Sequence, residues 1–302
     1  MKVLMTGVTG LIGKALCERL KSEGHIIVGL SRSPQKVKGL AVDEMHAWDT
    51  LSCPPPDAAL DGIDAVIHLA GEPIAEGRWT DAKKKRIRDS RLVSTRNLVE
   101  GMRAASSKPS VFLCSSAVGI YGDRGDEELD ERAQAGSGFL EDLCKAWEAE
   151  AGRARELGIR VVEVRTGVVL ATESGALAKM LPAFKMGVAG RLGNGRQWFP
   201  WIHLDDIVGL YIFALNTPTL NEPINGVAPE SVTNAEFTKQ LGKALHRPAF
   251  IPVPALGLKL LFGEMAAVLV ASQRAIPKTA LAAGYKFKYA SLAPALQNLV
   301  GK

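Results

Sequence analysis

The sequence predicts an α/β fold in which a doubly wound parallel sheet is followed by a smaller C-terminal lobe. Short, continuously apolar runs alternate with segments of helical periodicity up to about residue 170, a pattern typical of a parallel sheet covered on both faces. Beyond that point β-prone runs become sparse, and glycine turns and prolines become frequent. A glycine-rich turn also separates the first apolar run from the first amphipathic segment.

The predicted elements follow one another closely. Strands are expected at residues 2–6, 26–30, 65–70, 111–115 and 159–165, where the runs are almost entirely apolar. Helices are expected at residues 11–23, 80–105 and 139–157. Gly24 ends the first of these helices, and the prolines at 54–56 predict a rigid loop. A further helix at 256–271 is apolar on most of its surface and is expected to pack onto its own domain.

The change of pattern near residue 170 predicts two units. We expect a nucleotide-binding domain over residues 1–170 and a substrate-binding lobe over residues 171–302, with residues 200–230 or so returning to the first domain. At 302 residues the chain is long enough for one large core or two smaller ones.

Composition excludes several classes of protein. With 47% hydrophobic residues and a mean hydropathy of +0.06, the chain is an ordinary folded protein. Its longest apolar run, 255–271, contains Lys259 and Glu264, so no membrane span is expected. A net charge of +5 is too small and dispersed to indicate a nucleic-acid partner. The four cysteines form no Cys-x-x-Cys pair and no signal peptide is visible, so we expect free thiols, no metal site and a cytoplasmic location. We expect the protein to be a monomer or homodimer.

A cofactor site is predicted where the first strand meets the first helix. Gly7, Gly10 and Gly13 are spaced G-x-x-G-x-x-G and enclose Thr9. Glycines allow a tight turn and let backbone N–H groups and the helix N-terminus approach a pyrophosphate. The fold is therefore expected to be of the Rossmann type, and this glycine spacing is typical of short-chain dehydrogenases/reductases.

The end of the second strand indicates which nicotinamide cofactor is bound. A carboxylate at this position holds the ribose 2′-hydroxyl of NAD, whereas a basic residue holds the 2′-phosphate of NADP. The strand ends in Ser31 and Arg32, with Lys36 and Lys38 shortly after, and carries no carboxylate. A guanidinium with a hydroxyl suits a phosphate, so NADP is favoured over NAD. The alternative interpretation is a solvated basic loop.

Several motifs resemble those of the extended short-chain dehydrogenases, the NAD-dependent epimerase/dehydratase superfamily. The resemblance covers nearly the whole chain, and its motifs are residues 68–71 (HLAG), 114–117 (CSSA) followed by 121–122 (YG), 165–170 (RTGVVL) and 201–206 (WIHLDD). Other stretches resemble one epimerase-like branch, sometimes labelled cell-division inhibitors, that has its own C-terminal extension. These stretches are residues 70–74, 89–91, 139–148, 195–203, 225–229 and the tail 252–289.

The resemblance implies further cofactor contacts. Leu69, Ala70 and Gly71 would lie beside the adenosine, Leu11 and Ile12 at the glycine turn, and Val168 near the nicotinamide. Arg91 is also implied to help hold the cofactor; its partner is expected to be a cofactor phosphate or a carboxylate, and the alternative is an ordinary helix residue. The neighbouring basic run 83–88 is interpreted as the solvated face of a long helix. Nucleic-acid binding by this run is not expected, because no aromatic residues interleave it.

The catalytic residues that the resemblance implies are incomplete. The superfamily uses a Ser or Thr, a Tyr as acid/base and a Lys four residues after the Tyr. Ser116 and Lys145 match, but Glu141 occupies the tyrosine position. A carboxyl group, with a pKa of about 4.3, is ionised at neutral pH, whereas a phenol keeps its proton. Either Tyr121 supplies the proton or Glu141 does so with a pKa raised by desolvation.

Three functions follow from this departure. The protein is an NADP(H)-dependent oxidoreductase or epimerase acting on an unknown small molecule, an NADP(H)-binding redox sensor without turnover, or a structural protein with vestigial cofactor binding. Ser116 can also be a strand-end serine and Lys145 a surface helix lysine. Lys145 can, however, hold the ribose hydroxyls without any tyrosine. The five histidines lack metal-ligand spacing, and His203 is interpreted as a packing residue ahead of a helix capped by Asp205.

Overall fold

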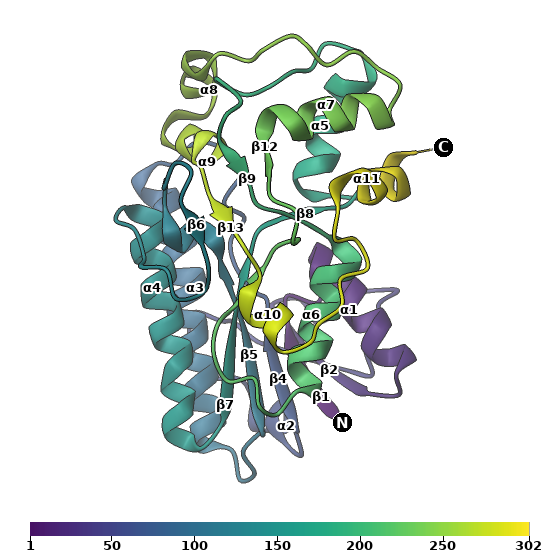
Figure 1. Cartoon of the computed structure of the whole chain (residues 1–302). Coiled ribbons are helices and arrows are strands. Elements are labelled where there is room, and N and C mark those ends of the chain that lie inside the picture. Colours follow the sequence, from purple (N-terminus) through teal and green to yellow (C-terminus); the bar gives the residue numbers. More distant parts are fainter. Residues whose placement is uncertain (302) are drawn as a thin grey trace.

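A seven-stranded parallel sheet forms the centre of the computed structural model, which describes residues 1–301 (Figure 1). The strand order is β11-β7-β5-β4-β1-β2-β3, and every pairing is parallel. The strands are β1 (Lys2–Thr6), β2 (Ile26–Ser31), β3 (Glu44–Ala47), β4 (Ala65–His68), β5 (Val111–Ala117), β7 (Arg160–Thr166) and β11 (Ile224–Gly226). The predicted doubly wound sheet is confirmed.

Helices cover both faces of this sheet. One face packs against α1 (Leu11–Ser22) and α6 (Leu204–Asn216), and the other against α2 (Asp57–Leu60), α3 (Asp81–Ala104) and α4 (Phe139–Gly152). Adjacent strand residues alternate between the two cores: Phe112 packs with the α3–α4 side and Leu113 with the α1–α6 side. Burial on both faces explains why the strands read as continuous apolar runs.

A smaller lobe lies beyond the carboxyl ends of the strands (Figure 1). Its own core includes Trp201, Phe237 and Leu292. It contains α5 (Gly175–Lys185), α7 (Asn234–Ala244), α11 (Leu292–Val300) and the short paired strands β8 (Val168–Leu170) with β10 (Trp201–His203), and β9 (Trp198–Phe199) with β12 (Val232–Thr233). Between these segments, α6 and β11 return to the central sheet.

The remaining elements are short. They are β6 (Glu128–Leu129), paired with β13 (Arg274–Ala275), α10 (Lys278–Ala282), and the 3-10 turns η1 (Pro34–Lys36), η2 (Val118–Tyr121) and η3 (Arg153–Leu157). The turn η3 follows α4 directly, so the helix predicted at 139–157 loses its α-helical form after Gly152.

The single helix predicted at 256–271 is wrong. The chain forms α8 (Ala255–Phe262), the 3-10 turn η4 (Gly263–Met265) and α9 (Ala266–Val270). Gly263 has φ +62°, a left-handed conformation that ends α8. Only Leu258 of α8 is buried, and Leu256, Leu260 and Leu261 remain 67–69% exposed, so the expected packing is also wrong for this helix. Within residues 1–301, no helix is long and apolar enough to span a bilayer.

Candidate functional site

The glycine turn between β1 and α1 has no room for side chains. A Cβ on Gly7, which has φ +70°, would lie 2.8 Å from the Leu69 carbonyl carbon. A Cβ on Gly13 would lie 2.2 Å from the Gly7 carbonyl oxygen. Gly10 is the N-cap of α1 and gives it no side-chain hydrogen bond. The N–H groups of the first helical turn, including Leu11 and Ile12, are therefore available to an anion.

A buried hydrogen-bond chain fixes the loop that faces this turn. Thr6 Oγ1 accepts hydrogen bonds from the Leu69 and Ala70 N–H groups, both at 3.1 Å. Its own proton is then donated to His68 Nδ1 at 2.7 Å, and His68 Nε2 donates to Ser94 Oγ at 3.2 Å. Because Leu69 and Ala70 bind a side chain, β4 ends at His68 and not at Ala70 as predicted.

His68 makes stability depend on pH. Burial, and secondarily the Arg91 charge, lower the pKa of His68 to about 3, so the folded protein keeps it neutral. Below its ordinary pKa of about 6.5 the unfolded chain takes up a proton that the folded chain does not, and stability falls as pH falls from about 6.5 towards 3. From pH 7.0 to 5.5 this group should cost about 1 kcal/mol.

The variant His68→Asn, which keeps an acceptor for Thr6, isolates this contribution. Urea unfolding at pH 7.0 should show a loss of about 1–3 kcal/mol, and the further loss on going to pH 5.5 should be about 1 kcal/mol smaller than in the wild type. Burial also lowers the pKa of His203, but that contribution is common to both proteins. An identical pH dependence in both would contradict the assignment.

At the carboxyl end of β2, Ser31 and Arg32 lie one strand from the glycine turn. Leu30 pairs with Thr6 of β1, and Ser31 Oγ accepts a hydrogen bond from the Ser33 N–H at 3.2 Å. The Arg32 side chain is exposed. The sheet thus places this guanidinium beside the turn, within reach of a ligand lying across β1 and β2.

Ser116 lies in a buried polar network. Its hydroxyl donates to Glu148 Oε1 at 2.6 Å, and the residue is 3% exposed. Arg165 donates to both carboxylate oxygens of Glu148, at 2.9 and 2.8 Å. Glu148, in α4, was not predicted as a site residue. Its distance from Glu141 along the sequence could have indicated it, because seven residues are two helical turns and place both carboxylates on one face of α4.

Tyr121 belongs to the same network. Its hydroxyl donates to Asn225 Oδ1 at 2.7 Å and accepts from Arg165 Nη1 at 3.1 Å. Burial raises its pKa, against the opposing effect of Arg165. Both Tyr121 and Ser116 thus direct their protons towards partners inside the protein.

Glu141 and Lys145 lie apart from this network. Lys145 Nζ pairs with Asp142 at 2.7 Å, and their side chains are 45% and 67% exposed. The Glu141 side chain packs over the loop at Gly122, Gly136 and Gly138, where an added Cβ would approach it to 2.7–3.1 Å.

The neighbouring pair of α4, Leu140 and Cys144, faces the end of β5. Leu140 lies against Gly119, and Cys144 packs in one small core with Ala117 and Val118. Burial raises the pKa of the Cys144 thiol to about 12, so it stays protonated. Val168, on β8, is half-buried and donates its N–H to the Pro200 carbonyl at 2.7 Å.

Two expectations for individual side chains are wrong. Lys83 is not solvated, because its side chain is buried and pairs with Glu72 at 2.8 Å. The cap of α6 is His203 and not Asp205: His203 Nδ1 accepts from the Asp205 N–H at 3.0 Å. A ring nitrogen at the N-cap can replace the usual carboxylate as acceptor.

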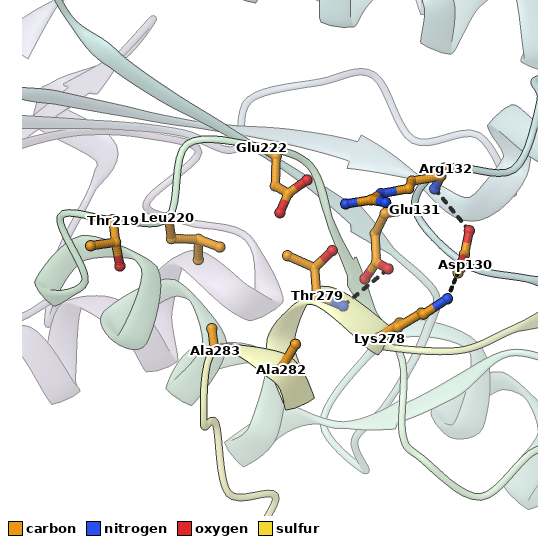
Figure 2. Close-up of a pocket in the computed structure, with 10 residues that line it drawn as sticks. All are labelled: Asp130, Glu131, Arg132, Thr219, Leu220, Glu222, Lys278, Thr279, Ala282 and Ala283. Atoms are coloured by element: carbon orange, nitrogen blue, oxygen red, sulfur yellow. Dashed lines mark hydrogen bonds and ion pairs between the residues drawn. The ribbon is translucent and has the colours of Figure 1, made fainter.

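A separate hollow of about 350 Å³ lies by β11 and α10 (Figure 2). Lys278 pairs with Asp130 there at 2.8 Å, and Glu131 accepts from the Thr279 N–H at 3.1 Å. None of the predicted cofactor or catalytic residues lines it. In the described part of the chain no group of three or more His, Cys, Asp or Glu side chains is placed to hold a metal.

Comparison with known proteins gives two family matches. The model of the NAD dependent epimerase/dehydratase family matches residues 3–225, and a domain of unknown function, DUF1731, matches residues 253–299.

Curated relatives and solved structures match nearly the whole of this chain. The epimerase family protein SDR39U1 homolog, chloroplastic, of Arabidopsis thaliana is 38% identical, over 99% of this chain and 87% of its own. The crystal structure of human epimerase family protein SDR39U1 with NADPH is 36% identical, with a TM-score of 0.88 and 99% of both chains covered. A nucleoside-diphosphate sugar epimerase structure from Corynebacterium glutamicum is 34% identical, with a TM-score of 0.80 over 100% of this chain and 58% of its own.

Proposed function

Because the chain belongs to the NAD dependent epimerase/dehydratase family, we propose that it binds NADP(H) and exchanges a hydride with a small molecule. The observation that carries the proposal is the turn at Gly7, Gly10 and Gly13, closed to side chains and opening onto an uncapped helix N-terminus. The human relative crystallised with NADPH supports the choice of cofactor.

The proposed cofactor site follows the order of the strands. The free N–H groups of Leu11 and Ile12 would bind the pyrophosphate, while Gly10, whose N–H donates to the Gly7 carbonyl at 2.9 Å, would form the turn beneath it. Ser31 and Arg32 would bind the 2′-phosphate. The segment Leu69, Ala70 and Gly71, held by Thr6, and Val168 on β8 would line the rest of the site. NADPH, when bound, supplies the hydride. All four cysteines are free, which supports a reducing compartment such as the cytoplasm.

The groups proposed to handle the proton are Ser116 and Tyr121, which Arg165 joins in one network. Ser116 donates its proton to Glu148, so its free lone pairs would accept a hydrogen bond from a substrate hydroxyl. Glu141 and Lys145 remain candidates only if they leave their present contacts: Glu141 packs over the loop at 136–138, and Lys145 pairs with Asp142 and donates to the Gly136 carbonyl at 3.4 Å.

A second function, NADP(H) sensing without turnover, is favoured by the inward direction of the Ser116 and Tyr121 protons. Incubation with NADPH and a panel of carbonyl compounds and nucleotide sugars separates the two. Substrate-dependent loss of NADPH absorbance, abolished in Ser116→Ala, supports the oxidoreductase. Tight binding without turnover on any compound supports the sensor. Failure to bind NADPH would overturn both proposals.

Removing the Arg32 guanidinium should change cofactor preference. In Arg32→Gln we expect NADPH affinity to fall about 10- to 100-fold, the value of one charge-assisted contact, and NADH affinity to stay within about twofold. Fluorescence titration with each cofactor measures this. Lys243→Gln, at an exposed position of α7 in the smaller lobe, serves as the control and should leave both affinities unchanged. Equal losses of NADPH and NADH affinity in Arg32→Gln would show that Arg32 does not read the 2′-phosphate.

A further inference from the structure

The most exposed large apolar side chains of the protein gather at one end of the smaller lobe. Within residues 1–301 the six with the highest exposed fractions, 52–76%, are Met186, Val188, Phe250, Leu256, Leu260 and Leu261. They belong to α8, to the segment that follows α5 and to the segment that joins α7 to α8. In Figure 1, α8 and the chain that leads to it from α7 lie at the top, on the side of the lobe away from the sheet. Single exposed apolar residues are normal, but a group of them indicates a binding surface.

Hydrogen bonds hold these segments side by side. The chain after α5 pairs with the chain before α8: the Ile251 N–H donates to the Ala189 carbonyl at 3.2 Å, and the Val253 N–H donates to the Arg191 carbonyl at 2.9 Å. α8 begins at Ala255, directly after this pairing. The six side chains therefore belong to adjoining segments of one surface, which we call the apolar patch.

Contacts on the opposite side of α8 keep its leucines exposed. Leu258 is 4% exposed and is the buried residue of this helix. Arg78 donates to two backbone carbonyls in the last turn of α8, and Glu264, just beyond the helix, pairs with Lys84. Because one face and the end of α8 are tied to the protein, the leucines of the patch point to solvent.

Positive charge accompanies the apolar patch. The stretches 174–204 and 237–263, which contain the patch, hold eight Lys and Arg residues and no Asp or Glu, although the net charge of the whole chain is only +5. Lys185, Arg191 and Lys259 are exposed. In the part of the chain that the structure describes, no carboxylate oxygen lies within 4.0 Å of these three cations. A partner that covers the patch must therefore be apolar and negatively charged.

Two kinds of protein partner fit this surface poorly. A second copy of the chain would bring like charges together. A partner helix would need an apolar groove, but the side chains of the patch project from the surface. None of them lines the hollow by α10 or a second hollow, of about 520 Å³, on α3.

An anionic bilayer meets both requirements. Apolar side chains of an interfacial helix enter the boundary between head groups and acyl chains, and Lys and Arg beside them lie among the lipid phosphates. The eight residues of α8 form a helix about 12 Å long. That length suits a helix that lies along a bilayer surface and is far too short to cross it.

We propose that the apolar patch binds the surface of an anionic lipid bilayer. Phe250 and the exposed leucines of α8 enter the interface, and Lys185, Arg191 and Lys259 contact lipid phosphates. The glycine turn stays free on binding, because it lies between β1 and α1 and outside the lobe. The proposal goes beyond the proposed function and does not depend on the cofactor.

Vesicle flotation with the full chain tests the proposal. One set of vesicles is pure phosphatidylcholine, and the other contains about 30% phosphatidylglycerol, both at about 0.1 M salt. We expect binding to the anionic vesicles to be at least about 10-fold stronger, and to weaken at about 1 M salt, where the Debye length falls to about 3 Å. Absence of binding to the anionic vesicles, or equal binding to both sets, would overturn the proposal.

Variants separate insertion of the leucines from attraction of the cations. Leu256→Ser combined with Leu260→Ser removes two leucines one helical turn apart, and should weaken binding to the anionic vesicles about 10- to 100-fold. Lys259→Gln should weaken it about fivefold. Leu281→Ser, at a 48% exposed position of α10, is the matched control and should change nothing. Urea unfolding should be the same for all these variants as for the wild type to within about 0.5 kcal/mol, because every substituted side chain is exposed.

The same variants identify a different occupant of the patch. Unchanged vesicle binding in the leucine double variant would show that charge alone acts, and would overturn the proposal. Sedimentation velocity that shows a dimer in the wild type and a monomer in the double variant would assign the patch to a second copy of the chain. Binding of poly-glutamate that the double variant loses, without binding to anionic vesicles, would assign it to an acidic protein.

Discussion

Gly13→Ala is expected to weaken the proposed NADPH binding at least 100-fold and to lower the free energy of unfolding by about 1–3 kcal/mol. The new Cβ would lie 2.2 Å from the Gly7 carbonyl oxygen and 2.9 Å from its carbonyl carbon. Both are backbone atoms, so relief of the clash must move the turn itself. Loss of two charge-assisted bonds to the pyrophosphate at about 1.5–3 kcal/mol each predicts at least a 100-fold loss of NADPH affinity.

The matched control is Gly257→Ala, which also replaces a helical glycine. Gly257 lies in α8, and an added Cβ would meet no heavy atom within 4 Å. Alanine is the better helix former, so this variant should be stabilised by about 0.5–1 kcal/mol with unchanged NADPH affinity. Urea unfolding and fluorescence titration measure both variants. Wild-type affinity in Gly13→Ala would contradict the proposed pyrophosphate site.

The sheet could be predicted from the sequence because its strands are buried on both faces. Continuous apolar runs and helical periodicity are local signals, and they located β1, β2, β4, β5 and β7. The short edge strands β3 and β11 were not predicted. Residues 44–47 of β3 are only partly buried, and residues 224–226 of β11 include Asn225 and Gly226. An edge strand depends on its neighbour more than on its own composition.

The glycine turn could be predicted as well, because glycine spacing indicates a backbone that must come close to other backbone atoms. The side chains of α4 that face the end of β5 could not. The resemblance paired Glu141 with Lys145, and the structure turns Leu140 and Cys144 to the end of β5. One residue along a helix is a rotation of about 100°, which only packing decides. The same holds for Arg165, whose pairing with Glu148 joins residues 17 positions apart.

The break of the predicted helix at the left-handed Gly263 could not be predicted from the local sequence either. The run 255–271 has the composition of one helix, and a glycine within a helical pattern is usually tolerated. Whether such a residue stays helical or turns left-handed depends on contacts beyond the run. Here α8 is tied at its end by Arg78, whose guanidinium donates to the Leu260 and Leu261 carbonyls. A contact across more than 180 residues leaves no local signal.

Glu148→Gln is expected to lower the free energy of unfolding by about 3–5 kcal/mol. The Arg165 and Glu148 side chains are 10% and 14% exposed, and Arg165 Nη2 lies 2.8 Å from Glu148 Oε2. Neutralising the carboxylate leaves a buried guanidinium whose remaining partners are the Tyr121 hydroxyl and the Glu131 carbonyl. An uncompensated buried charge, and not the loss of one hydrogen bond, accounts for the size of the effect.

Two comparisons separate that cause from simple loss of packing. Lys145→Gln removes the exposed ion pair of the same helix and should cost less than about 0.5 kcal/mol. The double variant Glu148→Leu with Arg165→Met removes both charges, and should be closer to the wild type than Glu148→Gln because no charge is left unpaired. Urea unfolding at pH 7 measures all three. If the double variant were less stable than Glu148→Gln, the polar contacts of the network with Ser116 and Tyr121, and not the isolated Arg165 charge, would dominate its contribution to stability.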